Sequence, residues 1–140
     1  AINPPTALYD VANGALLSPE YRGEFEAAIS ELDTWLEALS AACDTGGSFR
    51  TVTAPLDDRT HLETLRDGLA ARIKAVAEAT AANTSSMRAD YQLGRRTEID
   101  AILGYLLNDT RAWLPAGQVA PPTPILSRWL HTVQQRDSYL

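Results

Sequence analysis

Residues 21–39 read YRGEFEAAISELDTWLEAL and carry the clearest structural signal in the chain. Their apolar side chains recur three or four positions apart, at Tyr21, Phe25, Ala28, Ile29, Leu32, Trp35, Leu36 and Leu39. This spacing places the apolar side chains on one face of an α-helix. The preceding Ser18-Pro19 is typical of a helix start, because serine can cap free amides and proline is tolerated in a first turn. We therefore predict a long amphipathic helix that opens at Ser18-Pro19 and ends before Gly46-Gly47.

Helical spacing continues on both sides of this stretch. Shorter helices are predicted at about 4–11, 60–80, 86–92, 97–113 and from 124 onward. Asn13-Gly14 is expected to end the first of these because both residues accept a positive φ. Thr123-Pro124 is expected to cap the last one, and residues 44–59 are expected to form a loop. The pattern predicts an all-α bundle of about six helices, forming a single domain over residues 1–140.

Composition argues against several classes of protein. The chain has 12 basic and 18 acidic residues and a net charge of −6, whereas nucleic-acid binding needs a basic surface. It has no run of about 18 apolar residues, so we expect no membrane span. Cys43 is the single cysteine, and neither His61 nor His131 has a second ligand at metal spacing, so no metal site is predicted. A reduced, cytoplasmic setting is the corresponding expectation.

Candidate chemistry concentrates in Ser85-Ser86-Met87 and in the run GRRTEID at residues 94–100. Ser86 and Glu98 lie on either side of a glycine-broken joint between two predicted helices. Ser86 could donate to a ligand carboxylate near a helix start, where backbone amides favour anions, and Glu98 could accept from a hydroxyl or ammonium group. In the structural alternative, Ser85 or Ser86 caps the helix and Glu98 is a favourable first-turn acid, each worth about 1 kcal/mol or less.

Other polar residues near these positions also allow two interpretations. Asn3 could offer its amide to a ligand or cap the first helix. Ion pairs that fix the joint are the expected role of a mixed charge run formed by Asp90, Arg95, Arg96 and Asp100. Arg95 or Arg96 could instead face a phosphate, because a guanidinium group suits that geometry.

These motifs resemble the C-terminal domain of the ketopantoate reductase (2-dehydropantoate 2-reductase) family. That family shows a Ser-Ser-Met, an aspartate three residues on, and a Gly-Arg-x-Thr-Glu-Ile-Asp run. The matching positions here are Ser85-Ser86-Met87, Asp90 and Gly94–Asp100. Further similarity is found at Ile2–Leu8, with Pro5 where leucine is usual, at Asn13-Gly14, at Gly104-Tyr105 and at Pro122-Thr123-Pro124. Residues 40–60 match only loosely.

The resemblance implies a 6-phosphogluconate-dehydrogenase-like, two-domain enzyme that uses NADPH to reduce 2-dehydropantoate to pantoate in pantothenate biosynthesis. By position, Asn3 and Ser86 would bind substrate, and Glu98 would be a catalytic residue in contact with both substrate and cofactor. The family's general-acid lysine and its Rossmann NADP-binding domain would both precede Ala1, and Lys74 is in the wrong helix to replace that lysine.

Because the general-acid lysine and the Rossmann domain of the family would both lie outside this sequence, we expect that the isolated chain is inactive. The partners that the resemblance implies are a small 2-keto acid, the N-terminal Rossmann domain and a possible homodimer. A non-catalytic helical interaction or dimerisation module is the alternative function. An open cleft that presents Asn3, Ser86 and Glu98 together would favour the enzyme, whereas three side chains that point into separate helix caps or into solvent would favour the module.

Overall fold

The described chain consists of helices and the loops that connect them. In a computed structural model of the protein, residues 1–43 and 59–140 are described. The α-helices in these ranges are α1 (Asn3–Tyr9), α2 (Arg22–Cys43), α3 (Arg59–Arg66), α4 (Leu69–Ala79), α5 (Ser86–Gln92) and α6 (Pro124–Asp137). Two 3₁₀ helices, η1 (Asn13–Leu17) and η4 (Thr110–Trp113), and a π-helix, η3 (Asp100–Asp109), complete the set. The predicted all-α bundle is confirmed.

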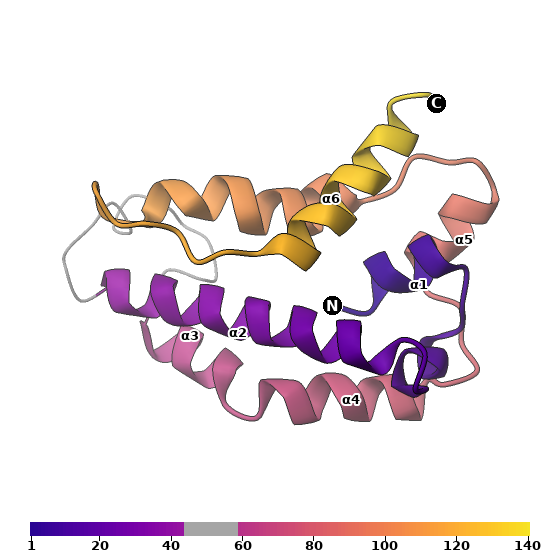
Figure 1. Cartoon of the computed structure of the whole chain (residues 1–140), viewed down its shortest axis with the longest axis horizontal. Helices are drawn as coiled ribbons and strands as arrows, with labels where there is room; N and C mark the ends of the chain where they lie inside the picture. The colour runs from indigo at the N-terminus through magenta and orange to yellow at the C-terminus, as the bar shows by residue number, and fades with distance from the viewer. Residues whose placement is uncertain (44–58) are drawn as a thin grey trace.

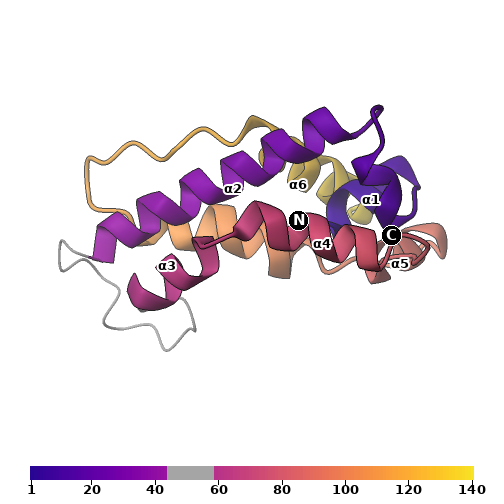
Figure 2. The same cartoon turned by 90° about the horizontal axis from the view of Figure 1, so that it is seen from below.

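The long helix α2 runs along the centre of the molecule (Figure 1). Helices α3 and α4 follow one side of it, and α6 and the π-helix η3 lie on the other side. Helices α1 and α5 pack against each other at one end, as the view from below also shows (Figure 2). Within the described residues, no helix combines the length and the apolar character needed to cross a bilayer.

The apolar face predicted for α2 is buried at the centre of the core. Its Phe25, Trp35 and Leu39 are at most 1% exposed. Large apolar side chains from the other helices surround them, among them Leu62, Met87, Ile99, Leu103, Leu107, Trp129 and Val133. Burial of each such side chain stabilises the fold by roughly 1.5–3 kcal/mol, so this core accounts for much of the stability of the bundle.

The acidic side chains of α2 hold the neighbouring helices by polar contacts. Glu24 Oε1 accepts hydrogen bonds from Trp129 Nε1 at 2.8 Å and from the Tyr9 hydroxyl, and it pairs with Arg128 Nη2 at 2.7 Å. It therefore joins α2 to α1 and α6. Glu26 Oε1 lies 2.7 Å from Lys74 Nζ on α4.

The start of α6 is capped from a distant part of the chain. Thr123 occupies the N-cap position, as predicted, but its side chain makes no capping hydrogen bond and its hydroxyl lies 3.0 Å from Ser127 Oγ. The free amides of Ile125 and Leu126 donate instead to the carboxylate of Glu31 on α2, at 3.0–3.1 Å. A carboxylate at a helix start satisfies the free N–H groups and favours the helix dipole.

Two predicted helix ends differ from the structure near the N-terminus. Helix α1 ends at Asp10, which adopts a left-handed φ of 53°, and Asn13-Gly14 begins η1 instead of ending a helix. Gly14 serves close packing, because a Cβ added there would lie 2.5 Å from Ala81 Cβ. Ser18-Pro19 forms the turn that leads into α2, since the Ser18 carbonyl accepts the Arg22 N–H at 2.9 Å.

Two further predictions fail in the second half of the chain. The helix predicted over 60–80 is broken by Gly68, whose φ of 62° separates α3 from α4, and Val76 is 51% exposed instead of buried. The helix predicted over 97–113 starts at Asp100 and is a π-helix followed by the 3₁₀ helix η4. Of the loop predicted over 44–59, residues 44–58 lie outside the described residues and Arg59 begins α3.

Candidate functional site

Asn3, Ser86 and Glu98 form a connected set of hydrogen bonds, which we call the polar triad. Asn3 Nδ2 donates to Ser86 Oγ at 3.3 Å and to Glu98 Oε1 at 3.5 Å. Ser86 Oγ in turn donates to Glu98 Oε1 at 3.2 Å. Ser86 and Glu98 are exposed and Asn3 is partly buried. The structure therefore brings an amide, a hydroxyl and a carboxylate from three parts of the sequence to one accessible place.

The contact between α1 and α5 explains why Asn3 meets Ser86. Each is the first residue of its helix. The buried hydroxyls of Thr6 on α1 and Ser85 before α5 lie 2.7 Å apart, which fixes the starts of the two helices side by side. Ser85 is the cap of α5, since its Oγ accepts the Arg88 N–H at 3.1 Å.

The capping interpretations therefore do not describe Ser86 or Asn3. Ser85 caps α5, and Ile2 occupies the N-cap position of α1. The side chains of Asn3 and Ser86 make their hydrogen bonds to each other and to Glu98 instead.

The joint, residues 93–98, carries Glu98 and is fastened by α6. Gly94, with a φ of 66°, turns the chain after α5. The N–H and hydroxyl of Thr97 donate to Asp137 Oδ2 at 2.9 and 2.7 Å. After the joint, Asp100 Oδ1 accepts from Gln134 Nε2 at 2.6 Å. Both ends of the Glu98 segment are thus held by the last helix.

The predicted ion pairs of the charge run are wrong. Among the ion pairs of the described ranges, none joins any two of Asp90, Arg95, Arg96 and Asp100. Arg95 and Arg96 are exposed. Contacts to side chains of α6 replace these pairs, because Asp137 and Arg136 of that helix accept from and donate to the backbone of the joint.

A groove of about 330 Å³ lies beside Asn3, lined by Ala1, Ile2, Asn3, Arg72, Ile73 and Val76. Its volume is within the range of small-molecule sites. Its lining is mostly apolar, with Asn3 and Arg72 as the polar residues, and the Arg72 guanidinium donates to the Leu65 carbonyl. The groove therefore suits a mostly apolar part of a small ligand whose polar end reaches Asn3. No signal in the sequence indicated this groove, because residues 1–3 and α4 share no motif.

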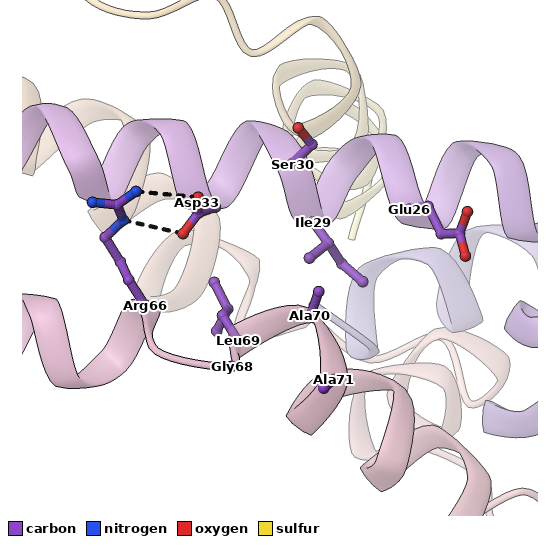
Figure 3. Close-up of a pocket in the computed structure, with 9 residues that line it drawn as sticks. All are labelled: Glu26, Ile29, Ser30, Asp33, Arg66, Gly68, Leu69, Ala70 and Ala71. Carbon is purple, nitrogen blue, oxygen red and sulfur yellow. Dashed lines mark hydrogen bonds and ion pairs between the residues drawn. The ribbon is translucent and has the colours of Figure 1, made fainter.

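A larger groove of about 520 Å³ lies between α2 and the break at Gly68 (Figure 3). Arg66 Nε and Nη2 lie 3.1 and 3.3 Å from the two carboxylate oxygens of Asp33, so these charges compensate each other. Its remaining lining is mostly small or apolar and includes no residue of the polar triad. This groove follows from the bend at Gly68, where α3 and α4 part from each other beside α2.

The residues considered for metal or thiol chemistry are dispersed. His61 and His131 are exposed on different helices, and the Cys43 thiol donates to the Leu39 carbonyl at 3.5 Å. In residues 1–43 and 59–140, no group of three or more His, Cys, Asp or Glu side chains is arranged to hold a metal ion.

The fold and the polar triad define a small all-α domain with an accessible amide, hydroxyl and carboxylate at one end. A family model described as "Ketopantoate reductase PanE/ApbA C terminal" matches residues 1–135. The chain therefore belongs to the ketopantoate reductase C-terminal domain family, which confirms the resemblance inferred from the sequence motifs.

Individual relatives carry a consistent name. A 2-dehydropantoate 2-reductase of Vibrio cholerae serotype O1 is 33% identical over 135 residues, covering 96% of this chain and 38% of that protein. A 2-dehydropantoate 2-reductase of Salmonella typhi is 33% identical over 110 residues, covering 79% of this chain and 29% of that protein. The chain thus spans 29–38% of the length of these relatives.

Proposed function

We propose that this chain is the substrate-side domain of an NADPH-dependent reductase that converts 2-dehydropantoate to pantoate. The observation that carries this proposal is that Asn3, Ser86 and Glu98 are hydrogen-bonded to one another. Ser86 lies 83 positions after Asn3 and 12 positions before Glu98 in the sequence. The names of the relatives support the same substrate. The geometry favours this function over a non-catalytic helical module, since a module would not need an accessible triad.

The substrate has three polar groups that match the donors and acceptors of the site. Its carboxylate and ketone oxygens accept hydrogen bonds, which Ser86 Oγ and Asn3 Nδ2 can donate. Its hydroxyl can donate to Glu98. Because the Glu98 carboxylate repels the carboxylate of the substrate, the substrate should lie with its hydroxyl toward Glu98 and its carboxylate away from it, near Ser86 and Asn3.

The triad is already oriented before substrate binds. Asn3 and Ser86 both donate to Glu98 Oε1, so the three side chains are held close together before a ligand arrives. Binding then exchanges these hydrogen bonds for bonds to the substrate, with little further ordering of the side chains. This preorganisation lowers the cost of binding and holds the ketone in one orientation.

NADPH would supply the hydride to the ketone carbon, and this chain offers only part of a cofactor site. The exposed carboxylate of Glu98 can accept from hydroxyl or amide groups of the cofactor, consistent with its expected dual contact. The sequence has no glycine-rich phosphate motif, so we assign the remaining cofactor contacts to a Rossmann domain that precedes residue 1.

The proton for the ketone oxygen also requires a group outside the described residues. Lys74 is paired with Glu26 at 2.7 Å between α4 and α2, so its ammonium group is already engaged there. We assign this proton to the upstream lysine that the family resemblance implies.

The proposal can be tested on the full-length protein by following NADPH oxidation with 2-dehydropantoate. We expect Ser86→Ala to lower kcat/KM about tenfold and Glu98→Gln about 100-fold, because each removes a directed polar contact to the reacting molecule. Ser30→Ala, an exposed serine in the larger groove, is the matched control and should leave kcat/KM unchanged. Wild-type kinetics in Ser86→Ala and Glu98→Gln would contradict the assignment.

A further inference from the structure

The last turn of α6 contains a partly buried charged network next to the joint, formed by Arg136 and Asp137. Both residues lie just beyond the 135 positions that the family model matches. Their side chains are only 20% and 13% exposed, and Arg136 Nη1 lies 2.7 Å from Asp137 Oδ1. Even partial burial of a charged side chain costs free energy unless its hydrogen bonds are satisfied, so each contact of the pair is informative.

Arg136 holds the α5 end of the joint. Its Nη2 donates to the Tyr91 carbonyl at 2.6 Å, and its Nη1 donates to the Arg95 carbonyl. Its guanidinium group also lies 4.3 Å from the centre of the Tyr91 ring. These contacts satisfy carbonyls at and beyond the end of α5, and α5 is the helix whose first residue is Ser86.

Asp137 holds the other end of the joint. Its Oδ2 accepts both the N–H and the hydroxyl of Thr97, at 2.9 and 2.7 Å. Thr97 Oγ1 also accepts the Ile99 N–H at 3.4 Å. The Thr97 hydroxyl is therefore bonded both to Asp137 on α6 and to the residue that follows Glu98. Hydrogen bonds from Thr97 and Arg136 outweigh the effect of burial and hold the pKa of Asp137 below its usual value, which keeps it an acceptor.

We propose that Asp137 is a positioning residue for the reductase reaction, acting through Thr97 to hold Glu98 against Ser86 and Asn3. This inference rests on the proposed function. Glu98 is exposed, and its side chain bonds only to the two other members of the triad within the described residues. Its place therefore depends on its backbone, and Asp137 fixes the residue immediately before it. A displacement of about 1 Å at a reacting site can cost about 100-fold in rate.

A double-mutant cycle on the full-length protein separates positioning from general stability. With 2-dehydropantoate and NADPH, we expect Asp137→Ala to lower kcat/KM about tenfold or more. In a Glu98→Gln background, the same substitution should change kcat/KM by less than about twofold, because the carboxylate it positions is gone. Gln135→Ala, exposed on the same turn, is the control and should have no effect. An equal loss in both backgrounds would overturn the proposal.

Two substitutions of Thr97 test the same proposal if the Asp137→Ala protein does not fold. Thr97→Ser keeps the hydroxyl and should remain within about twofold of wild type, whereas Thr97→Val should lose about tenfold. Equal kinetics for the two variants would contradict a role for this hydroxyl.

A structural measurement separates this inference from the proposed function. Wild-type protein without 2-dehydropantoate reductase activity would refute the function alone. Crystal structures of the full-length wild type, Asp137→Ala and Thr97→Val then decide the inference. We expect Ser86 Oγ and Glu98 Oε1 to move apart in the variants. A preserved hydrogen bond in both would overturn the positioning role.

Discussion

Replacing Gly14 with alanine should destabilise the domain, although alanine is normally the better residue in a helix. The added Cβ would lie 2.5 Å from Ala81 Cβ and 2.9 Å from Ala81 Cα. Carbon atoms normally approach to about 3.5–4.0 Å, so η1 and the turn at Ala81 would have to separate. That turn is held in place, because the Gly14 N–H donates to the Ala81 carbonyl at 3.0 Å and the Asn13 N–H donates to the Asn83 carbonyl at 3.1 Å.

The magnitude follows from these contacts. Overpacking of this kind costs about 1–3 kcal/mol, and a weakened backbone hydrogen bond adds about 1 kcal/mol. The lower conformational entropy of the unfolded alanine chain offsets about 0.4–1 kcal/mol. We therefore expect the free energy of unfolding to fall by about 1–3.5 kcal/mol, because the steric overlap outweighs the entropic gain.

Urea denaturation followed by circular dichroism measures this difference directly. Gly23→Ala is the matched control, since a Cβ at Gly23 in the first turn of α2 meets nothing within 4 Å. It should leave the stability unchanged or raise it by up to about 1 kcal/mol. A Gly14→Ala protein within about 0.5 kcal/mol of wild type, the range of an ordinary surface substitution, would refute the reasoning.

The remaining predictions concern the acidic side chains of α2. Glu31→Ala removes the acceptor for the Ile125 and Leu126 amides. It should lower the free energy of unfolding by about 1–2 kcal/mol in the same urea assay. An unchanged free energy of unfolding would mean that α6 does not need this cap. Burial disfavours the charge on Glu24, but hydrogen bonds from Tyr9, Trp129 and Arg128 outweigh it and hold the pKa of Glu24 below its ordinary value. The stability that this carboxylate provides is present above its unfolded pKa and lost as the pH falls through the lowered folded pKa, so Glu24→Gln should flatten the loss of stability at acidic pH. Parallel pH profiles for Glu24→Gln and wild type would contradict this linkage.

Local signals in the sequence were sufficient where one residue and its near neighbours decide the structure. The helix predicted over 86–92 is α5, because Ser85 caps it and Gly94 takes the positive φ after it. The apolar spacing of α2 likewise predicts its buried face. For the candidate site, the motif pattern selected Asn3, Ser86 and Glu98, which the structure places together, whereas their roles remain predictions.

Other features depend on residues far apart in sequence. Glu31 caps a helix that begins more than ninety positions later, and no local pattern marks it for that contact. The close approach of Gly14 to Ala81 is equally invisible to turn rules, which treat Asn-Gly as a positive-φ pair. Gly68 was missed because the apolar spacing continues through it, although its φ of 62° breaks the helix. Asp137 was missed because it carries no motif and acts on a residue forty positions earlier.

The placement of charge on α2 matters for anyone who redesigns the surface of this domain. Glu24, Glu26, Glu31 and Asp33 contribute to the net charge of −6, yet each one secures another helix or its end. Neutralising these four side chains to change the solubility of the domain would remove contacts between helices and so lower its stability. An exposed acid such as Glu78 is the safer place to begin, since a designer can remove its charge without detaching a helix.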